Sequence, residues 1–265
     1  MTDLHALLRI RHHIGSVIER ATGDSTVICD QVRPIVRDAV IDQDFVIACV
    51  EHTALAFERQ DFSNPPIVDD EEREFSIRLI PWPKSVSNHP HRHDHWTVTA
   101  VMAGRLRFEI YEERSGNLSL QRAILAQRGE AGAIVPPCIH RVVNENDGPS
   151  LSLHVFSGKR ALQAHAERRP YQRGQTVWYG APDSQKPTVL DLVYGLLSTL
   201  SQIEPAMAIP PLRRLCRRGP ANCRMAAIKA LALLDLGAAK DEAMNLANVL
   251  DDQNALALRN VVSGL

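Results

Sequence analysis

The sequence predicts a mainly β fold, a jelly roll with helices at both ends of the chain. Apolar residues recur at helical spacing over residues 1 to about 60. Residues 74–158 have the pattern of short strands separated by turn residues, which is typical of sandwiches and barrels. From residue 187 the chain is again helical in pattern. We therefore expect an N-terminal helical segment (1–73), a barrel (74–165) and a C-terminal helical extension (187–265).

The N-terminal segment has the pattern of amphipathic helices that cover a sheet. Leu4, Leu7 and Leu8 begin the first apolar stripe, and similar spacing recurs around Val32 and Val36. Residues 61–73 are polar and contain two prolines, so they predict a connection and not an element.

The barrel segment is predicted from alternation and punctuation. Leu106, Phe108 and Ile110 alternate with charged residues, the period-2 pattern of a half-buried strand. The segments are separated by Gly104, Ser115-Gly-Asn117, Gly129 and Asn146-Asp-Gly148. The predicted strands are 75–82, 96–103, 106–112, 118–126, 133–135, 139–144 and 151–157.

The C-terminal extension predicts short helices divided by Pro and Gly. They are expected at 189–203, from Pro210 onward, and at 221–236, 239–250 and 255–262. Their Leu- and Ala-rich faces resemble one or two helix-pair repeats of the HEAT type. A helical cap or a dimerisation element is the alternative.

Composition excludes several classes of protein. The net charge is −1 and the pI about 6.8, so no overall field recruits nucleic acid or an anionic membrane. The arginines at 213, 214, 217 and 218 are expected to form a solvated helix face. No apolar run approaches the ~18 residues of a membrane span, and the first residues lack signal-peptide features, so we expect a cytoplasmic protein. Five cysteines without CxxC spacing predict free, mostly buried thiols.

Chemistry is concentrated in the run from Asn88 to Trp96, where His89, His91, His93 and His95 occupy alternate positions. In an extended segment such residues share one face, and neutral imidazoles suit iron, nickel, copper and zinc. The sequence thus predicts a metal site, although the run alone leaves open which histidines are ligands.

Several motifs resemble the cupins, whose first motif is HxH, a few residues, usually a Glu, then six residues and a Gly. Measured back from Gly104, the two histidines of this motif are His91 and His93, and Thr97 occupies the position where the motif usually has Glu. His140-Arg-Val-Val-Asn supplies the histidine of the second motif. With Ser152-Leu-His-Val-Phe, these segments look like the thiol dioxygenases, which include cysteine and 3-mercaptopropionate dioxygenases. The resemblance covers about residues 30–160 and implies a double-stranded β-helix.

The resemblance also implies site residues. His91, His93 and His140 would be the ligands of Fe(II), and Ser152 and His154 would form a hydrogen-bonded pair beside it.

Substrate recognition is expected from four residues. A substrate carboxylate would pair with an arginine, for which Arg59 is the candidate by position and Arg78 and Arg160 are rivals. Thr97 and Phe156 would line the site. Phe156 stands where the family has a tyrosine, and Phe156 offers no hydroxyl.

The leading hypothesis is therefore an iron dioxygenase that oxidises a small thiol to a sulfinate, with the substrate and O₂ as its partners. One alternative is an iron oxygenase acting on a larger or non-thiol substrate. A second is a metal-binding sensor or scaffold that turns nothing over. The C-terminal helices would serve a homodimer or dock a partner.

Overall fold

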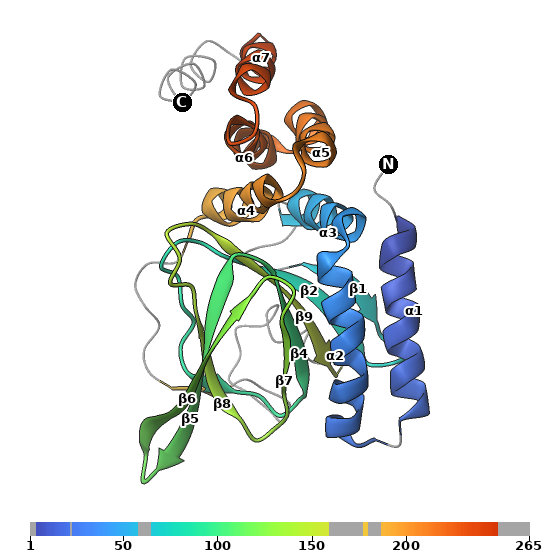
Figure 1. Cartoon of the computed structure of the whole chain (residues 1–265), viewed down its shortest axis with the longest axis vertical. Helices are drawn as coiled ribbons and strands as arrows, with labels where there is room; N and C mark the ends of the chain where they lie inside the picture. The colour runs from blue at the N-terminus through green and yellow to red at the C-terminus, as the bar shows by residue number, and fades with distance from the viewer. Residues whose placement is uncertain (1–3, 22, 58–64, 159–176, 180–186, 249–265) are drawn as a thin grey trace.

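Two five-stranded antiparallel sheets face each other and enclose a barrel (Figure 1). The computed structural model describes residues 4–21, 23–57, 65–158, 177–179 and 187–248. The first sheet has the order β1 (Pro66–Asp70), β2 (Phe75–Trp82), β9 (Ser150–Ser157), β4 (Thr97–Ala103) and β7 (Ala131–Ile134). The second has the order β10 (Val177–Trp178), β3 (His91–Arg92), β8 (Ile139–Val143), β5 (Arg105–Arg114) and β6 (Asn117–Gln127).

The strand order is that of a jelly roll. From β2 to β9 the chain alternates between the sheets, except at the β5–β6 hairpin. Around this hairpin the pairings are nested, because β4 pairs with β7 and β9, β5 and β3 pair with β8, and β2 pairs with β9. Gly104 makes the β4–β5 turn with a φ of +70°, a conformation that favours glycine. The predicted double-stranded β-helix is confirmed.

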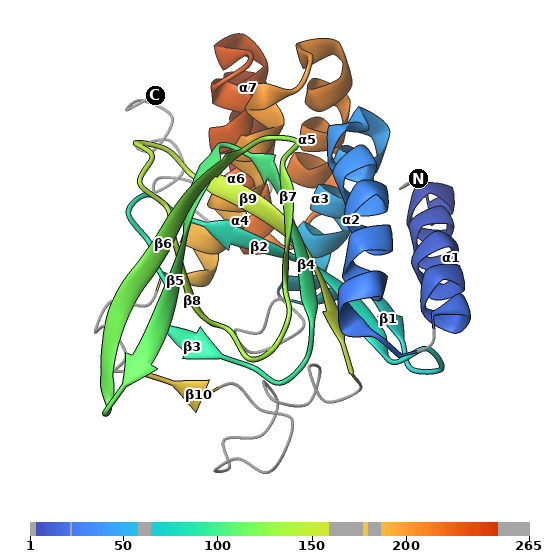
Figure 2. The same ribbon diagram turned by 60° about the horizontal axis from the view of Figure 1, so that its bottom comes forward.

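Three N-terminal helices cover the outer face of the first sheet, as Figure 2 shows. Asp24 and Asp42 cap the second and third helices by accepting hydrogen bonds from backbone N–H groups of the first turn. The helices are α1 (Leu4–Arg20), α2 (Ser25–Ile41) and α3 (Gln43–Ala56).

Strand alternation separates the helix-covered face of the first sheet from the barrel interior. Leu151, Leu153 and Val155 of β9 join the helices in the main apolar cluster, so Ser152 and His154 face inward.

The interior itself is divided along the strands. A small apolar cluster of Trp82, Val101, Leu106 and Val142 fills one part. The part around His154 is polar and buried, and this is where a site can form.

The C-terminal helices pack onto the barrel through the same core. Figure 1 shows α4 nearest the barrel and α7 farthest from it. Leu196, Leu212 and Ile228 belong to the apolar cluster that also contains the N-terminal helices. The predicted helical extension is thus confirmed as α4 (Val189–Ser198), a 3₁₀ turn (Thr199–Gln202), α5 (Pro205–Arg218), α6 (Ala221–Ala232) and α7 (Leu236–Ala247).

Several predicted boundaries were wrong. The stretch predicted as a connection contains β1. Among the described strands β1 pairs with β2 alone, so it lies at the edge of its sheet. Strands β3 and β10 are two residues each, too short for a periodic signal. Helix α5 begins at Pro205 and not at Pro210, because Pro205 occupies the first turn, where a missing N–H costs nothing. The helix predicted at 255–262 lies outside the described residues.

The arginines of α5 form the solvated face that the sequence predicted, with Arg214, Arg217 and Arg218 exposed, and two of them also bind buried carboxylates of neighbouring helices. Arg214 binds the buried carboxylate of Glu51 on α3, with nitrogen–oxygen distances of 2.9–3.2 Å. Arg217 binds the buried carboxylate of Glu242 on α7. A buried carboxylate needs a charged partner, so these arginines connect helices.

Cysteine and membrane expectations can also be compared with the structure. All five cysteines are free thiols; Cys138 is half-buried and the other four are buried, as predicted. No helix in the described part of the chain has both the length and the apolar character that a membrane crossing requires.

Candidate metal centre

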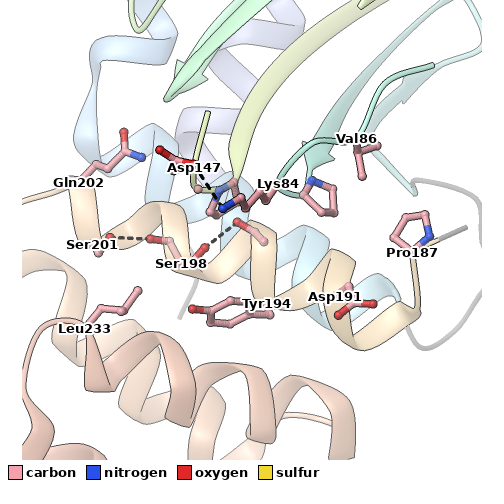
Figure 3. Close-up of a pocket in the computed structure, with 14 residues that line it drawn as sticks. Lys84, Val86, Asp147, Pro187, Asp191, Tyr194, Ser198, Ser201, Gln202 and Leu233 are labelled. Carbon is pink, nitrogen blue, oxygen red and sulfur yellow. Dashed lines mark hydrogen bonds and ion pairs between the residues drawn. The ribbon is translucent and has the colours of Figure 1, made fainter. Parts of the chain in front are cut away.

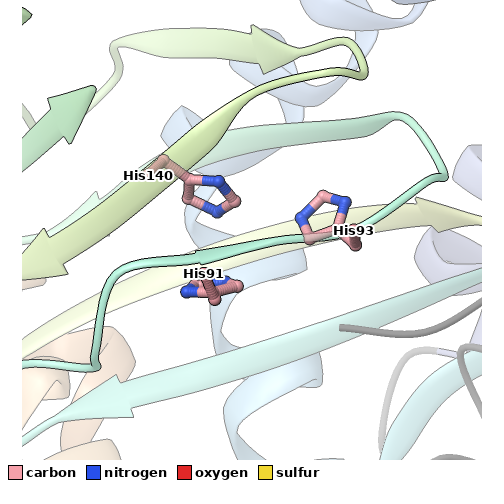
Figure 4. A group of neighbouring side chains, drawn as sticks. All are labelled: His91, His93 and His140. Carbon is pink, nitrogen blue, oxygen red and sulfur yellow. The ribbon is translucent and has the colours of Figure 1, made fainter. Parts of the chain in front are cut away.

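Three of the predicted histidines converge in the barrel interior (Figure 4). His91 lies in β3, His93 follows that strand, and His140 lies in β8 as the register partner of His91. Their ligand nitrogens all lie within 4.8 Å of one another, and the three side chains are buried. The structure therefore brings together the three residues predicted as metal ligands.

Backbone carbonyls orient the three rings. Nδ1 of His91 lies 2.8 Å from the carbonyl of His89, and Nδ1 of His93 lies 2.8 Å from that of His95. Nδ1 of His140 faces the carbonyl of Cys138 at 3.5 Å. A carbonyl only accepts, so each Nδ1 carries the proton and each Nε2 keeps its lone pair. Such hydrogen bonds fix the tautomer and orientation of metal-ligating histidines.

Burial keeps these imidazoles neutral. It lowers the pKa of His91 to about 4 and that of His140 to about 2, and it lowers the pKa of His93 below its ordinary value. Metal ligation requires neutral imidazole. The donor set thus fits a divalent metal that accepts nitrogen, and no carboxylate belongs to the cluster among the residues described.

The two flanking histidines are not part of this cluster. The ring of His95 stacks on that of His93, with centroids 4.2 Å apart and an interplanar angle of 15°. Burial lowers the pKa of His95 to about 4. His95 therefore packs against one of the clustered histidines, as expected for a neighbouring residue, and His89 contributes its carbonyl.

A chain of hydrogen bonds passes through the predicted Ser152–His154 pair. The Trp82 indole N–H donates to Ser152 Oγ at 2.8 Å, and Ser152 Oγ lies 2.7 Å from His154 Nε2. His154 Nδ1 lies 2.9 Å from Thr99 Oγ1. Burial lowers the pKa of His154 to about 3. Sequence reasoning missed Thr99; its place two residues after Thr97, on the same face of one strand, was the available signal.

The predicted substrate residues lie in two rows on the inner face of the first sheet. Arg78, His154 and Thr99 are register partners across β2, β9 and β4. Burial lowers the pKa of Arg78 and the nearby Asp69 carboxylate opposes that shift.

The adjacent row contains Thr97 and Phe156, which are register partners on β4 and β9. Thr97 is buried, and the Phe156 ring stacks on His154 with centroids 5.4 Å apart. Phe156 thus places an aromatic ring beside His154 but offers no hydroxyl there. Arg59 and Arg160 lie outside the described residues.

A pocket of about 440 Å³ reaches this centre. Its lining comes mainly from β4, β5, β6 and β7, with Thr99 on β4, and includes His140 of β8 and Arg37 of α2. Most other lining side chains are apolar, among them Phe108, Ile110 and Ile124. The candidate metal centre is therefore adjacent to a cavity large enough for an organic ligand.

A second hollow lies between the barrel and α4 (Figure 3). None of the three clustered histidines lines it. Its Ser198 hydroxyl donates to the carbonyl of Gly195, and Lys84 forms an ion pair with Asp147 at 3.3 Å. These polar groups are already paired, so we assign no chemistry to this hollow.

Comparison with known proteins yields structures of low similarity. No protein-family model and no curated protein matches the sequence. A sugar phosphate isomerase from a cupin superfamily, from Silicibacter pomeroyi, is 19% identical over 32% of this chain and 50% of its own, with a TM-score of 0.26. A Cupin 2 conserved barrel domain protein from Salinispora arenicola is 20% identical over 42% and 82%, with a TM-score of 0.29. An oxalate oxidase in complex with glycolate is 17% identical over 52% and 61%, with a TM-score of 0.31.

The present chain thus spans half the length of that isomerase and less than two thirds of that oxidase. Likenesses with such TM-scores carry no argument about this protein. Its fold follows from the strand order, and its candidate metal centre follows from the three converging imidazoles.

Proposed function

We propose that the chain is a mononuclear metal-dependent oxygenase of the thiol dioxygenase type, in which His91, His93 and His140 hold Fe(II). The observation that carries the proposal is the convergence of three neutral imidazoles, each with Nδ1 bound to a backbone carbonyl. Because no carboxylate joins the set in the described residues, a bound divalent ion keeps its full charge. That charge favours an anionic thiolate.

Fe(II) in this site would supply the redox chemistry by which both atoms of O₂ are added to a thiol sulfur, giving a sulfinate.

The residues around the centre orient the reactants. His154 is held from both sides, by Ser152 at Nε2 and by Thr99 at Nδ1. Its lowered pKa keeps it uncharged at neutral pH, so it positions neighbouring groups without adding a cation. Arg78, one strand away in the same row, offers a guanidinium for the carboxylate of a mercapto acid. These roles are part of the proposal.

The test is oxygen consumption by iron-loaded protein. The protein is purified without metal, loaded with Fe(II) without O₂, and then mixed with cysteine or 3-mercaptopropionate in an oxygen electrode. We expect O₂ uptake together with a product 32 mass units heavier than the thiol, since two oxygen atoms of mass about 16 are added. The matched variant His140→Ala should show neither. Failure of every thiol tested to consume O₂ with fully loaded protein would rule the proposal out.

A second candidate is an oxygenase for a larger or non-thiol substrate. It is favoured by the pocket of about 440 Å³, which exceeds the size of a three-carbon thiol. Turnover of a non-thiol by the iron-loaded protein, with no thiol oxidised, would select this candidate.

A further inference from the structure

The pocket beside the metal centre is apolar along its walls. Phe108 and Ile110 from β5 and Ile124 from β6 line it, together with Thr99 of β4 and His140 of β8. Its volume of about 440 Å³ falls within the ~300–1,000 Å³ range typical of small-molecule sites. A ligand there would bury apolar surface against these walls, which is the main source of affinity in such pockets.

The charged residues lining the pocket are already bound to neighbours. Arg37 of α2 pairs with Asp38 at 2.9 Å, and Glu130 accepts a hydrogen bond from the backbone N–H of Gln127 at 2.8 Å. The Arg37 side chain is 56% exposed, so its charge is screened by water. Recognition within the pocket therefore depends on shape, apolar contact and the polar groups of Thr99 and His140.

Gly132 leaves open space next to one of those polar groups. It is the register partner of Thr99 on β7 and lies on the same face of the sheet. A Cβ added at Gly132 would meet no atom within 4 Å among the residues described, and its φ is not in the left-handed region. Larger side chains can therefore be introduced here to occupy the pocket.

The direction of the hydrogen-bond chain leaves one proton to be donated into that space. The Trp82 indole N–H can only donate, so Ser152 Oγ accepts from it. We assign the Ser152 hydroxyl proton to the contact with His154 Nε2, which is the potential acceptor within reach of Ser152 Oγ among the described residues. In this arrangement His154 carries its proton on Nδ1 and donates it to Thr99 Oγ1. The Thr99 hydroxyl proton remains available on the pocket side.

We propose that this pocket binds an organic substrate with an apolar body, whose hydrogen-bond acceptor receives the Thr99 hydroxyl while its reacting end lies beside His140. The assignment of this ligand as a substrate rests on the proposed oxygenase function. It narrows the proposed substrates from amino-acid-like thiols to thiols that carry an apolar group. Thr99 is a positioning residue in this scheme, since it contacts the substrate acceptor and is oriented by His154.

The first experiment measures binding without turnover. Calorimetry without O₂ compares benzyl mercaptan with cysteine on the iron-loaded protein. A parallel titration uses benzyl alcohol and metal-free protein, so that the pocket is tested independently of metal chemistry. Because a buried aromatic ring contributes more than 1.4 kcal/mol, we expect benzyl mercaptan to bind at least about tenfold more tightly than cysteine.

Five variants locate the site. Gly132→Phe and Gly132→Val should weaken benzyl alcohol binding by about tenfold or more, whereas Gly132→Ala should change it by less than about threefold. Thr99→Val should weaken it about fivefold by removing one hydrogen bond, and Thr99→Ser should restore it. Two bulky substitutions of Gly132 are included so that one unfolded variant does not leave the pocket untested.

The outcomes separate this inference from the proposed function. Benzyl alcohol binding that depends on Gly132 and Thr99 supports the pocket assignment even if no thiol consumes O₂. Absence of benzyl alcohol binding, or binding unaffected by Gly132→Phe and Gly132→Val, overturns the assignment even if cysteine is oxidised. Tighter binding of cysteine than of benzyl mercaptan overturns it as well.

Discussion

Removing the Ser152 hydroxyl should destabilise the protein more than most single-atom deletions. Ser152 is completely buried and its oxygen lies 2.8 Å from Trp82 Nε1 and 2.7 Å from His154 Nε2. In Ser152→Ala both nitrogens lose these bonds in a place that excludes water. Each stranded buried polar group costs about 1–3 kcal/mol, so we expect a loss of about 3–4 kcal/mol in the free energy of unfolding. Thr99→Val affects only His154 Nδ1 and should cost about half as much.

Urea denaturation of the metal-free protein, followed by tryptophan fluorescence at pH 7, measures these differences. Ser76→Ala is the matched control, because Ser76 is equally buried on the adjacent strand β2 and its hydroxyl has no hydrogen-bond partner among the described residues. The control should change stability by less than about 0.5 kcal/mol. If Ser152→Ala costs less than about 1 kcal/mol, or less than Thr99→Val, the hydrogen-bond chain inferred here is incorrect.

Three further results are expected. His140→Ala should lose bound metal in elemental analysis while His89→Ala retains it, because only the former removes a ring from the cluster; equal metal content in both would contradict the ligand assignment. Burial alone would raise the pKa of Asp70, but hydrogen bonds from two arginines and a backbone N–H outweigh it and hold that pKa below the ordinary value. Its stabilising contribution is therefore present above the unfolded pKa of about 4 and is lost as pH falls below it. In urea denaturation, Asp70→Asn should cost about 2 kcal/mol at pH 7, and the gap to the parent protein should close below about pH 4; a gap independent of pH would refute this. A double-mutant cycle of Glu51→Gln and Arg214→Met should give a coupling energy of about 1–2 kcal/mol, discounted because the Arg214 side chain is 45% exposed, and a value near zero would show that this contact does not connect α3 to α5.

Local patterns were sufficient for the strands of the barrel. The alternation at Leu106, Phe108 and Ile110 and the turn at Gly104 are properties of short segments, and the structure has β5 and its preceding turn there. The same alternation placed Ser152 and His154 on one face. The edge strand β1 escaped prediction because its acidic residues resemble a loop, and its pairing with β2 is decided by the rest of the sheet.

The sequence supplied the histidine run, and a short extended segment places alternate residues of that run on one side. The resemblance to the cupins then selected His91 and His93, by their distance from Gly104, and added His140. Its distance from His91 in the chain is 49 residues, from 140 minus 91, so only strand pairing brings the two rings together.

Only the tertiary structure shows which residues surround these three histidines. Thr99 reaches His154 because β4 and β9 are paired in one register, and Gly132 leaves space beside it because β7 lies next in the sheet. Likewise, the α5 arginines became helix contacts because α3 and α7 bring buried carboxylates to them. Periodicity describes which face a residue occupies within its own element, whereas the identity of its neighbours depends on how elements distant in sequence pack together.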